Sequence, residues 1–140
     1  MRFWDASAIV PLLVNETGSP AIETLFREDP GQVVWCLTEV EISSALARRD
    51  REGALEVEPA AAARDSLRKL AQSWEEVVSV DTVRSRAIRL LRTHALRATD
   101  ALQLAAALVA CDERPESLPF ICLDDRLRDA ARKEGFPVHP

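Results

Sequence analysis

Short apolar runs alternate with segments of helical periodicity along the whole chain, and this alternation limits the possible folds more than any other feature. Four runs are predicted to be buried strands: Arg2–Asp5, Val33–Leu37, Val77–Val80 and Phe120–Leu123. Parallel strands are joined by crossovers, usually helices, and strands buried on both faces are apolar throughout. We therefore expect an α/β fold with a central parallel sheet of four to five strands and helices on both faces.

Helices are predicted between these strands from their periodicity and their end signals. They are expected over Ser7–Val14, Pro20–Glu28 and Thr38–Glu52, from Pro59 to about Trp74, from Asp81, from Thr99, and over Asp124–Glu134. Gly53 and Gly135 follow two of them at the position where glycine commonly ends a helix. The helices between Thr38 and Trp74 are expected to form a hairpin on one side, and Pro137-Val138 to add a short edge strand.

Length and composition are those of one ordinary globular domain. The 140 residues are 47% hydrophobic and 29% charged, so we expect a single domain over residues 1–140. No apolar run approaches the roughly 20 residues that span a bilayer, and no signal peptide is recognisable, which predicts a cytoplasmic protein outside the membrane. Cys36, Cys111 and Cys122 lie in apolar surroundings without a CxxC pair, so reduced, buried thiols are expected.

Four acidic residues stand at the starts of predicted helices: Asp5, Glu41, Asp100 and Asp124. Each alone is explained by the stabilising effect of acids in a first helical turn, and Thr38 with Glu41 has the spacing of a capping box. Together they indicate a shared binding site, because ligands bind beyond the carboxyl ends of parallel strands. Gathered carboxylates repel one another, and a hard cation such as Mg²⁺ relieves that repulsion. The pattern predicts a metal-dependent phosphodiesterase. The net charge of −5 is unusual for a nucleic-acid-binding protein, and the acids of the metal site explain part of it.

Four segments resemble the motifs of the PIN-domain family, and together they span essentially the whole chain. FWDASAIVPLL resembles the family's opening, with Asp5 at the end of a strand. LTEVEISSALARR resembles its Thr-x-x-Glu helix start, with Glu41 as the acid. RATDALQLAAAL resembles the helix that carries the third acid, Asp100, and FICLDDRLRDAARKEGFPV resembles the last motif, with Asp124 in the active position.

The size and layout are most similar to VapC-type toxin ribonucleases of type II toxin–antitoxin systems. The resemblance implies catalytic and metal-binding roles for the four acids, and excludes their neighbours Glu39 and Asp125 from those roles. It implies an endoribonuclease that depends on Mg²⁺, with Mn²⁺ as a substitute, and hydrolyses RNA phosphodiester bonds with a metal-activated water.

Three further residues are predicted to support the site. Ser7 either contacts the metal through water, steadies Asp5, or caps its helix. Arg97 and Arg126 flank the acids in sequence and could meet phosphates. Two positions depart from the family's pattern, with Cys122 where Thr or Ser is frequent and Gln103 where His is frequent, but neither change removes a carboxylate.

The resemblance also implies two protein partners, a second copy in a homodimer and a cognate VapB-like antitoxin. The alternative is a catalytically silent PIN domain that acts as a protein- or RNA-binding module, which the loss of an acid would favour. An aspartyl phosphatase usually has a second Asp where Ser7 stands, and a signalling receiver domain needs a lysine on a late strand, which is missing.

Overall fold

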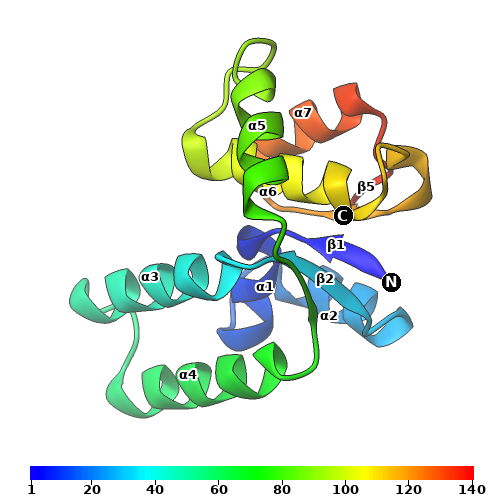
Figure 1. The fold of residues 1–140 in the computed structure, drawn as a ribbon. Helices are drawn as coiled ribbons and strands as arrows, with labels where there is room; N and C mark the ends of the chain where they lie inside the picture. The colour runs from blue at the N-terminus through cyan, green and yellow to red at the C-terminus, as the bar shows by residue number, and fades with distance from the viewer.

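Five parallel strands form a sheet at the centre of the computed structural model, which describes residues 1–140 (Figure 1). The strands are β1 (Arg2–Trp4), β2 (Gln32–Trp35), β3 (Glu75–Val77), β4 (Phe120–Ile121) and β5 (Val138–His139). Their order across the sheet is β3-β2-β1-β4-β5, and every neighbouring pair is parallel. The chain therefore winds outward from β1 in one direction and later in the other. This reversal creates a topological switch point between β1 and β4, the place where ligands bind in such sheets.

Helices cover both faces of the sheet, as expected. They are α1 (Ala6–Leu13), α2 (Ser19–Glu28), α3 (Thr38–Arg51), α4 (Val57–Ala71), α5 (Val80–Leu90), α6 (Ala98–Ala110) and α7 (Asp125–Glu134), with one 3-10 turn at η1 (Pro115–Ser117). The first four lie on one face and the last three on the other (Figure 1). The predicted α/β class is confirmed, and α3 and α4 form the predicted hairpin. No helix is both long and apolar enough to cross a membrane.

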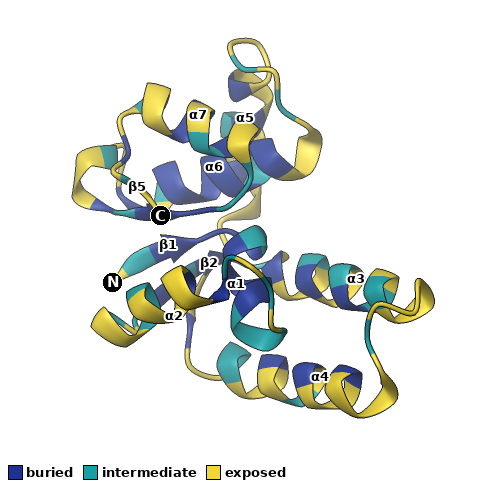
Figure 2. Ribbon diagram, turned by 180° about the vertical axis from the view of Figure 1, so that it is seen from behind, coloured by how far each residue is buried: buried dark blue, intermediate teal, exposed yellow.

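Successive residues of the strands point to opposite faces and enter two separate cores. Phe3 and Trp35 belong to the core beneath α5, α6 and α7, whereas Trp4 and Val34 belong to the core beneath α1 to α4. Figure 2 shows buried residues along the sides of the helices that face the sheet and exposed residues on their outer sides. Burial on both faces explains why the inner strands are apolar throughout.

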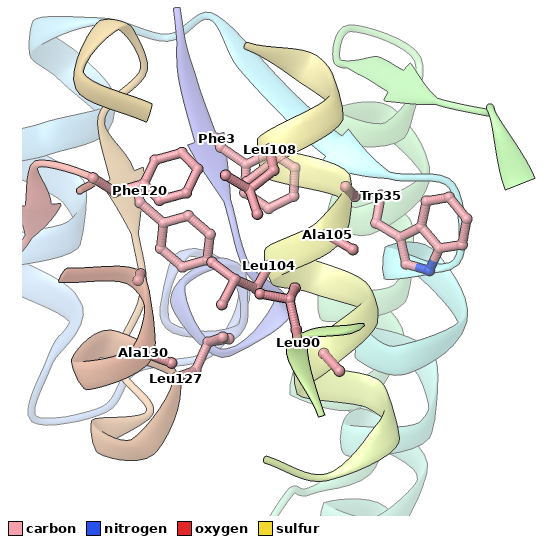
Figure 3. Close-up of a cluster of buried hydrophobic side chains, with 14 of the residues drawn as sticks. Phe3, Trp35, Leu90, Leu104, Ala105, Leu108, Phe120, Leu127 and Ala130 are labelled. Carbon is pink, nitrogen blue, oxygen red and sulfur yellow. The ribbon is translucent and has the colours of Figure 1, made fainter. Parts of the chain in front are cut away.

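Helix α6 is buried on most of its surface, as its nearly all-apolar sequence predicted. Leu104, Ala105 and Leu108 lie against the sheet beside Phe3 and Phe120, whose rings stack with centroids 5.3 Å apart (Figure 3). The small alanine side chains let the helix approach the strands closely. This packing fixes the first turn of α6 near the carboxyl ends of β1 and β2.

The predicted third strand, Val77–Val80, is wrong in position. Residues Glu75–Val77 form β3, and Val78 and Val80 lie beyond it with 66% and 50% of their surface exposed. The reason is that β3 is an edge strand whose residues 75 and 76 are exposed, so its own apolar content is low. The apolar run that follows it lies outside the sheet.

Helix ends were predicted with mixed success. Gly53 and Gly135 have φ values of +71° and +102°, which confirms that each provides the left-handed conformation that ends a helix. The helix predicted from Asp81, with Asp81 as its cap, begins instead at Val80, so Ser79 is the N-cap residue and Asp81 lies in the first turn. The other boundaries differ from prediction by at most three residues, the largest difference being at the end of α4, predicted near Trp74 and found at Ala71. Such differences are expected where helix ends fray.

Candidate functional site

A cavity of about 340 Å³ lies at the carboxyl end of the sheet and brings all four predicted acids together. Its lining includes Asp5, Glu41, Asp100 and Asp124. They come from the end of β1 and from the beginnings of α3, α6 and α7, so four helix N-termini converge there. Helix N-termini favour negative charge, which offsets part of the repulsion among the carboxylates.

Asp5 is held by a network that reaches across the sheet. It is only 4% exposed and is the N-cap of α1. Its Oδ2 accepts hydrogen bonds from the Ser7 backbone N–H at 3.0 Å, from the Ser7 hydroxyl, and from the Cys122 thiol at 3.6 Å. The Ser7 oxygen in turn accepts from the Leu123 N–H at 3.0 Å. Asp5 rather than Ser7 therefore caps the helix, and the Ser7 hydroxyl steadies Asp5 and links it to the segment after β4.

Burial raises the pKa of Asp5 above its ordinary value. The hydrogen bonds from Ser7 and Cys122 oppose this rise, and the negative charge of Asp100 adds to it. Such a carboxyl holds a proton more tightly than a free aspartic acid, unless a cation replaces the proton.

Glu41 is oriented by Gln103, a buried residue of α6. The Gln103 amide donates to Glu41 Oε1 at 3.2 Å and to Thr38 Oγ1 at 3.0 Å. The predicted capping box is therefore wrong, because Leu37 is the N-cap residue and makes no side-chain capping bond. The Thr38 hydroxyl is fully buried and accepts a hydrogen bond from Gln103 instead. Burial, followed by the charge of Asp5, raises the pKa of Glu41 to about 7.

Asp100 and Asp124 both line the cavity, and both pair with the guanidinium group of Arg97. Arg97 Nε lies 3.5 Å from Asp100 Oδ2, and Arg97 Nη2 lies 3.8 Å from Asp124 Oδ2. Asp100 is 9% exposed, and its buried Oδ2 has no hydrogen-bond partner. Burial, followed by the charge of Asp124, raises the pKa of Asp100 despite Arg97. Asp124 caps α7 by accepting from the Leu127 N–H at 2.9 Å.

The neighbouring acids lie outside the cavity, as the motif spacing implied. Glu39 is exposed on the first turn of α3. The Asp125 side chain is 98% exposed and pairs with Arg128 at 3.7 Å. Of the supporting residues, Ser7 and Arg97 line the cavity, whereas Arg126 lines an adjoining depression together with Arg97 and Asp124.

Sequence reasoning missed several polar residues of the cavity. Arg48, Arg49, Glu16 and Thr99 also line it, and Arg49 pairs with Glu16 at the rim. The two arginines lie seven and eight residues after Glu41 on α3, which places them on the same face two turns later. That spacing was a usable signal, whereas nothing local connects Glu16 with α3.

The chemistry of the cavity fits a hard divalent cation. Its acidic ligands are all carboxylates, three of them have raised pKa values, and the buried Asp100 Oδ2 accepts no hydrogen bond although Arg97 pairs with it. As the side chains stand, no three acids, histidines or cysteines are gathered closely enough to hold an ion. Arg97 instead neutralises two of the acids. Because its side chain is 73% exposed, it is free to move aside.

The fold and the cavity define an α/β protein with an oxygen-rich acidic site at the carboxyl edge of a parallel sheet. No family model matches the chain. The chain is similar to Ribonuclease VapC45 of Mycobacterium tuberculosis strain CDC 1551 / Oshkosh and to Ribonuclease VapC49 of strain ATCC 25618 / H37Rv. Each is 36% identical over 146 residues, covering 99% of this chain and 94% of the relative. The chain therefore belongs to the VapC ribonuclease family.

Proposed function

We propose that this protein is a toxin of the VapC type, built on a PIN domain, which hydrolyses RNA phosphodiester bonds at the acidic cavity and depends on Mg²⁺ or Mn²⁺. The observation that carries the proposal is the convergence of Asp5, Glu41, Asp100 and Asp124 on one cavity in a chain of the VapC family. These acids would hold the cation, since Mg²⁺ prefers carboxylate oxygens. A bound cation of this kind supplies an activated water and stabilises charge on the phosphate.

Two of the acids are already fixed for such a role by hydrogen bonds from other elements. The Ser7 hydroxyl holds Asp5, and the Gln103 amide holds Glu41. Both are positioning residues, because they act through the carboxylates. Preorganised ligands lose little conformational freedom when the substrate arrives, and this supports a catalytic use of the cavity.

No protein nucleophile competes with water. The Ser7 hydroxyl donates to Asp5, and burial strongly raises the pKa of the Cys122 thiol, which therefore stays protonated. His94 is 9% exposed in its side chain and lies 3.7 Å from Glu134, outside the cavity. Direct hydrolysis by water needs none of these groups.

Three arginines at the cavity are suited to the RNA backbone. Arg48, Arg49 and Arg97 line the same space as the acids. Guanidinium groups form paired hydrogen bonds with phosphate oxygens. When a bound cation neutralises Asp100 and Asp124, Arg97 would leave these two carboxylates and pair with a phosphate of the RNA.

The test is metal-dependent cleavage of a fluorescently labelled, structured RNA by the full chain. Wild type should cleave with Mg²⁺ or Mn²⁺ and stop in EDTA, and Asp5→Ala or Asp100→Ala should abolish cleavage. Asp125→Ala is the matched control, since it removes an exposed acid beside the cavity and should leave the rate unchanged. Cleavage that survives EDTA would overturn the metal mechanism. A folded wild-type protein that cleaves nothing would favour a silent binding module.

We also propose a homodimer and a VapB-like antitoxin as protein partners. Four exposed apolar side chains near the carboxyl ends of β2 and β3 support such contacts: Leu37, Val40, Val78 and Val80. Trp35 pairs with Val77, so these two strand ends are adjacent. Light scattering should give twice the mass of the chain, and Val40→Asp with Val78→Asp should reduce it to one. A wild-type protein that is monomeric would refute the dimer.

A further inference from the structure

A series of connected depressions leads away from the acidic cavity along the side of α7. The cavity shares Arg97 and Asp124 with a second depression, which shares Arg126 with a third. The third shares Thr93 and His94 with a fourth. The path therefore runs between α7 and the segment that joins α5 to α6, and it ends beside the last turn of α5.

Cations outnumber acids in the third and fourth depressions, although the whole chain carries a net charge of −5. The second depression contains two aspartates beside its two arginines. The third and fourth depressions contain five cationic side chains, which we call the arginine track: Arg86, Arg89, Arg92, Arg126 and Lys133. The only carboxylates lining these depressions are those of Asp129 and Glu134. The remaining excess of positive charge lies next to the site where a polyanion would be cut.

Three members of the arginine track have no partner in the structure. Lys133 pairs with Asp129 at 2.9 Å, and Arg86 pairs with Glu113 at 2.9 Å. Arg89, Arg92 and Arg126 are exposed and form no ion pair or side-chain hydrogen bond. Free guanidinium groups lose no existing contact when they bind an anion.

We propose that the arginine track binds the phosphate backbone of the RNA strand on one side of the cut, which rests on the proposed ribonuclease function. Its length follows α7, whose 10 residues span about 15 Å at about 1.5 Å per residue. That distance accommodates about four phosphates at the roughly 3.4 Å spacing of a stacked strand and fewer in an extended one.

The chemistry of the track favours a nucleic acid over a protein segment. The fourth depression has no hydrophobic residue, and the third has only Ala95, Leu96 and Ala130. A bound peptide would therefore bury little apolar surface. The one aromatic ring lining these depressions is the imidazole of His94, whose side chain is only 9% exposed. The track therefore contacts the backbone with little base stacking, and it discriminates little between sequences.

The experiment compares Arg89→Gln/Arg92→Gln with Arg27→Gln/Arg51→Gln. Each pair loses two charges near helix C-termini, and neither pair forms an ion pair or lines the acidic cavity. Binding of a fluorescein-labelled oligouridine of about ten nucleotides, within the roughly 4–16-nucleotide range of single-strand sites, is measured by anisotropy over a series of salt concentrations. Asp100→Asn is added to every protein so that the probe is not cut.

The track variant should bind the oligouridine about tenfold more weakly per lost contact near 50 mM salt. A plot of its log affinity against log salt should have a slope smaller by about 1.4, which is about 0.7 per contact. The control pair should match the parent protein. With Asp100 restored, the track variant should raise KM for long RNA and leave kcat unchanged.

Two results would overturn the inference, and a third would separate it from the proposed catalysis. If the track and control variants bind oligouridine equally, the track is not an RNA site, even where wild-type RNA cleavage stands. If the track variant keeps its affinity for oligouridine but loses affinity for polyglutamate, the surface serves an acidic protein segment. If the salt slope falls as expected while wild type cleaves no RNA, the track is supported and the proposed catalysis fails.

Discussion

Replacing Glu41 by Gln should stabilise the metal-free protein while abolishing its activity. In the folded state, burial and the charges of Asp5 and Asp100 raise the pKa of Glu41 from 4.5 to about 7. Gln keeps the oxygen that accepts from Gln103 at 3.2 Å but carries no charge. The substitution therefore removes both the cost of burying a charge and the repulsion from Asp5 and Asp100, and it preserves the contact that orients the side chain.

The magnitude follows from the difference in proton affinity. A tenfold change in proton affinity corresponds to about 1.4 kcal/mol. Ionised Glu41 therefore destabilises the fold by at most about 3 kcal/mol. Solvent screening of this half-buried group reduces the expected value to about 2 kcal/mol. Below pH 4.5 both folded and unfolded chains hold the proton, and the penalty is absent. As pH rises toward 7 only the folded chain retains it, so stability falls through this window and then levels off.

Urea unfolding in EDTA at pH 8 and at pH 4 is the assay. Glu41→Gln should raise the unfolding free energy at pH 8 by about 2 kcal/mol and change it little at pH 4. Glu39→Gln is the matched control, since it removes an exposed acid from the same helical turn and the same favourable interaction with the helix dipole. If Glu41→Gln is no more stable than Glu39→Gln at pH 8, the inferred cost of burying an ionised Glu41 beside Asp5 and Asp100 is refuted.

Three other outcomes are expected. Ser7→Ala removes the partner of the Leu123 N–H and of Asp5, so urea unfolding should show a loss of about 1–3 kcal/mol; an unchanged free energy would contradict this network. Gln103→Leu should lower the rate of RNA cleavage more than Gln103→His, which retains a donor toward Glu41; equal rates would remove Gln103 from a positioning role. Calorimetry should find Mg²⁺ affinity rising with pH up to about 7, because the cation displaces the proton of Glu41; a flat profile would mean that Glu41 does not bind the metal.

Local patterns in the sequence predicted much of this architecture. Apolar runs marked the inner strands because these are buried on both faces, and Gly53 and Gly135 marked helix ends because each adopts a positive φ. The same reasoning failed at β3, where an edge strand with exposed glutamates gave no apolar signal.

Some features of the candidate site could likewise be predicted from the sequence, whereas others depend on packing. The four acids could be found because each follows a strand or begins a helix, and the carboxyl ends of parallel strands meet at one edge. The contacts of Gln103 with Thr38 and Glu41 join residues more than 60 positions apart. No periodicity within one helix encodes such a contact, since it depends on how α6 packs against the sheet.

The sequence by itself determined the order of strands and helices, the two-sided burial of the sheet and the acids at the helix starts, because these follow from local spacing and polarity. The tertiary structure alone decided which charged groups from different elements meet. Arg49 pairs with Glu16 at the rim of the cavity, and α7 meets the segment between α5 and α6 to form the arginine track. The physical reason is that electrostatic neighbours are set by distances in space, and the packing of helices on the sheet fixes those distances.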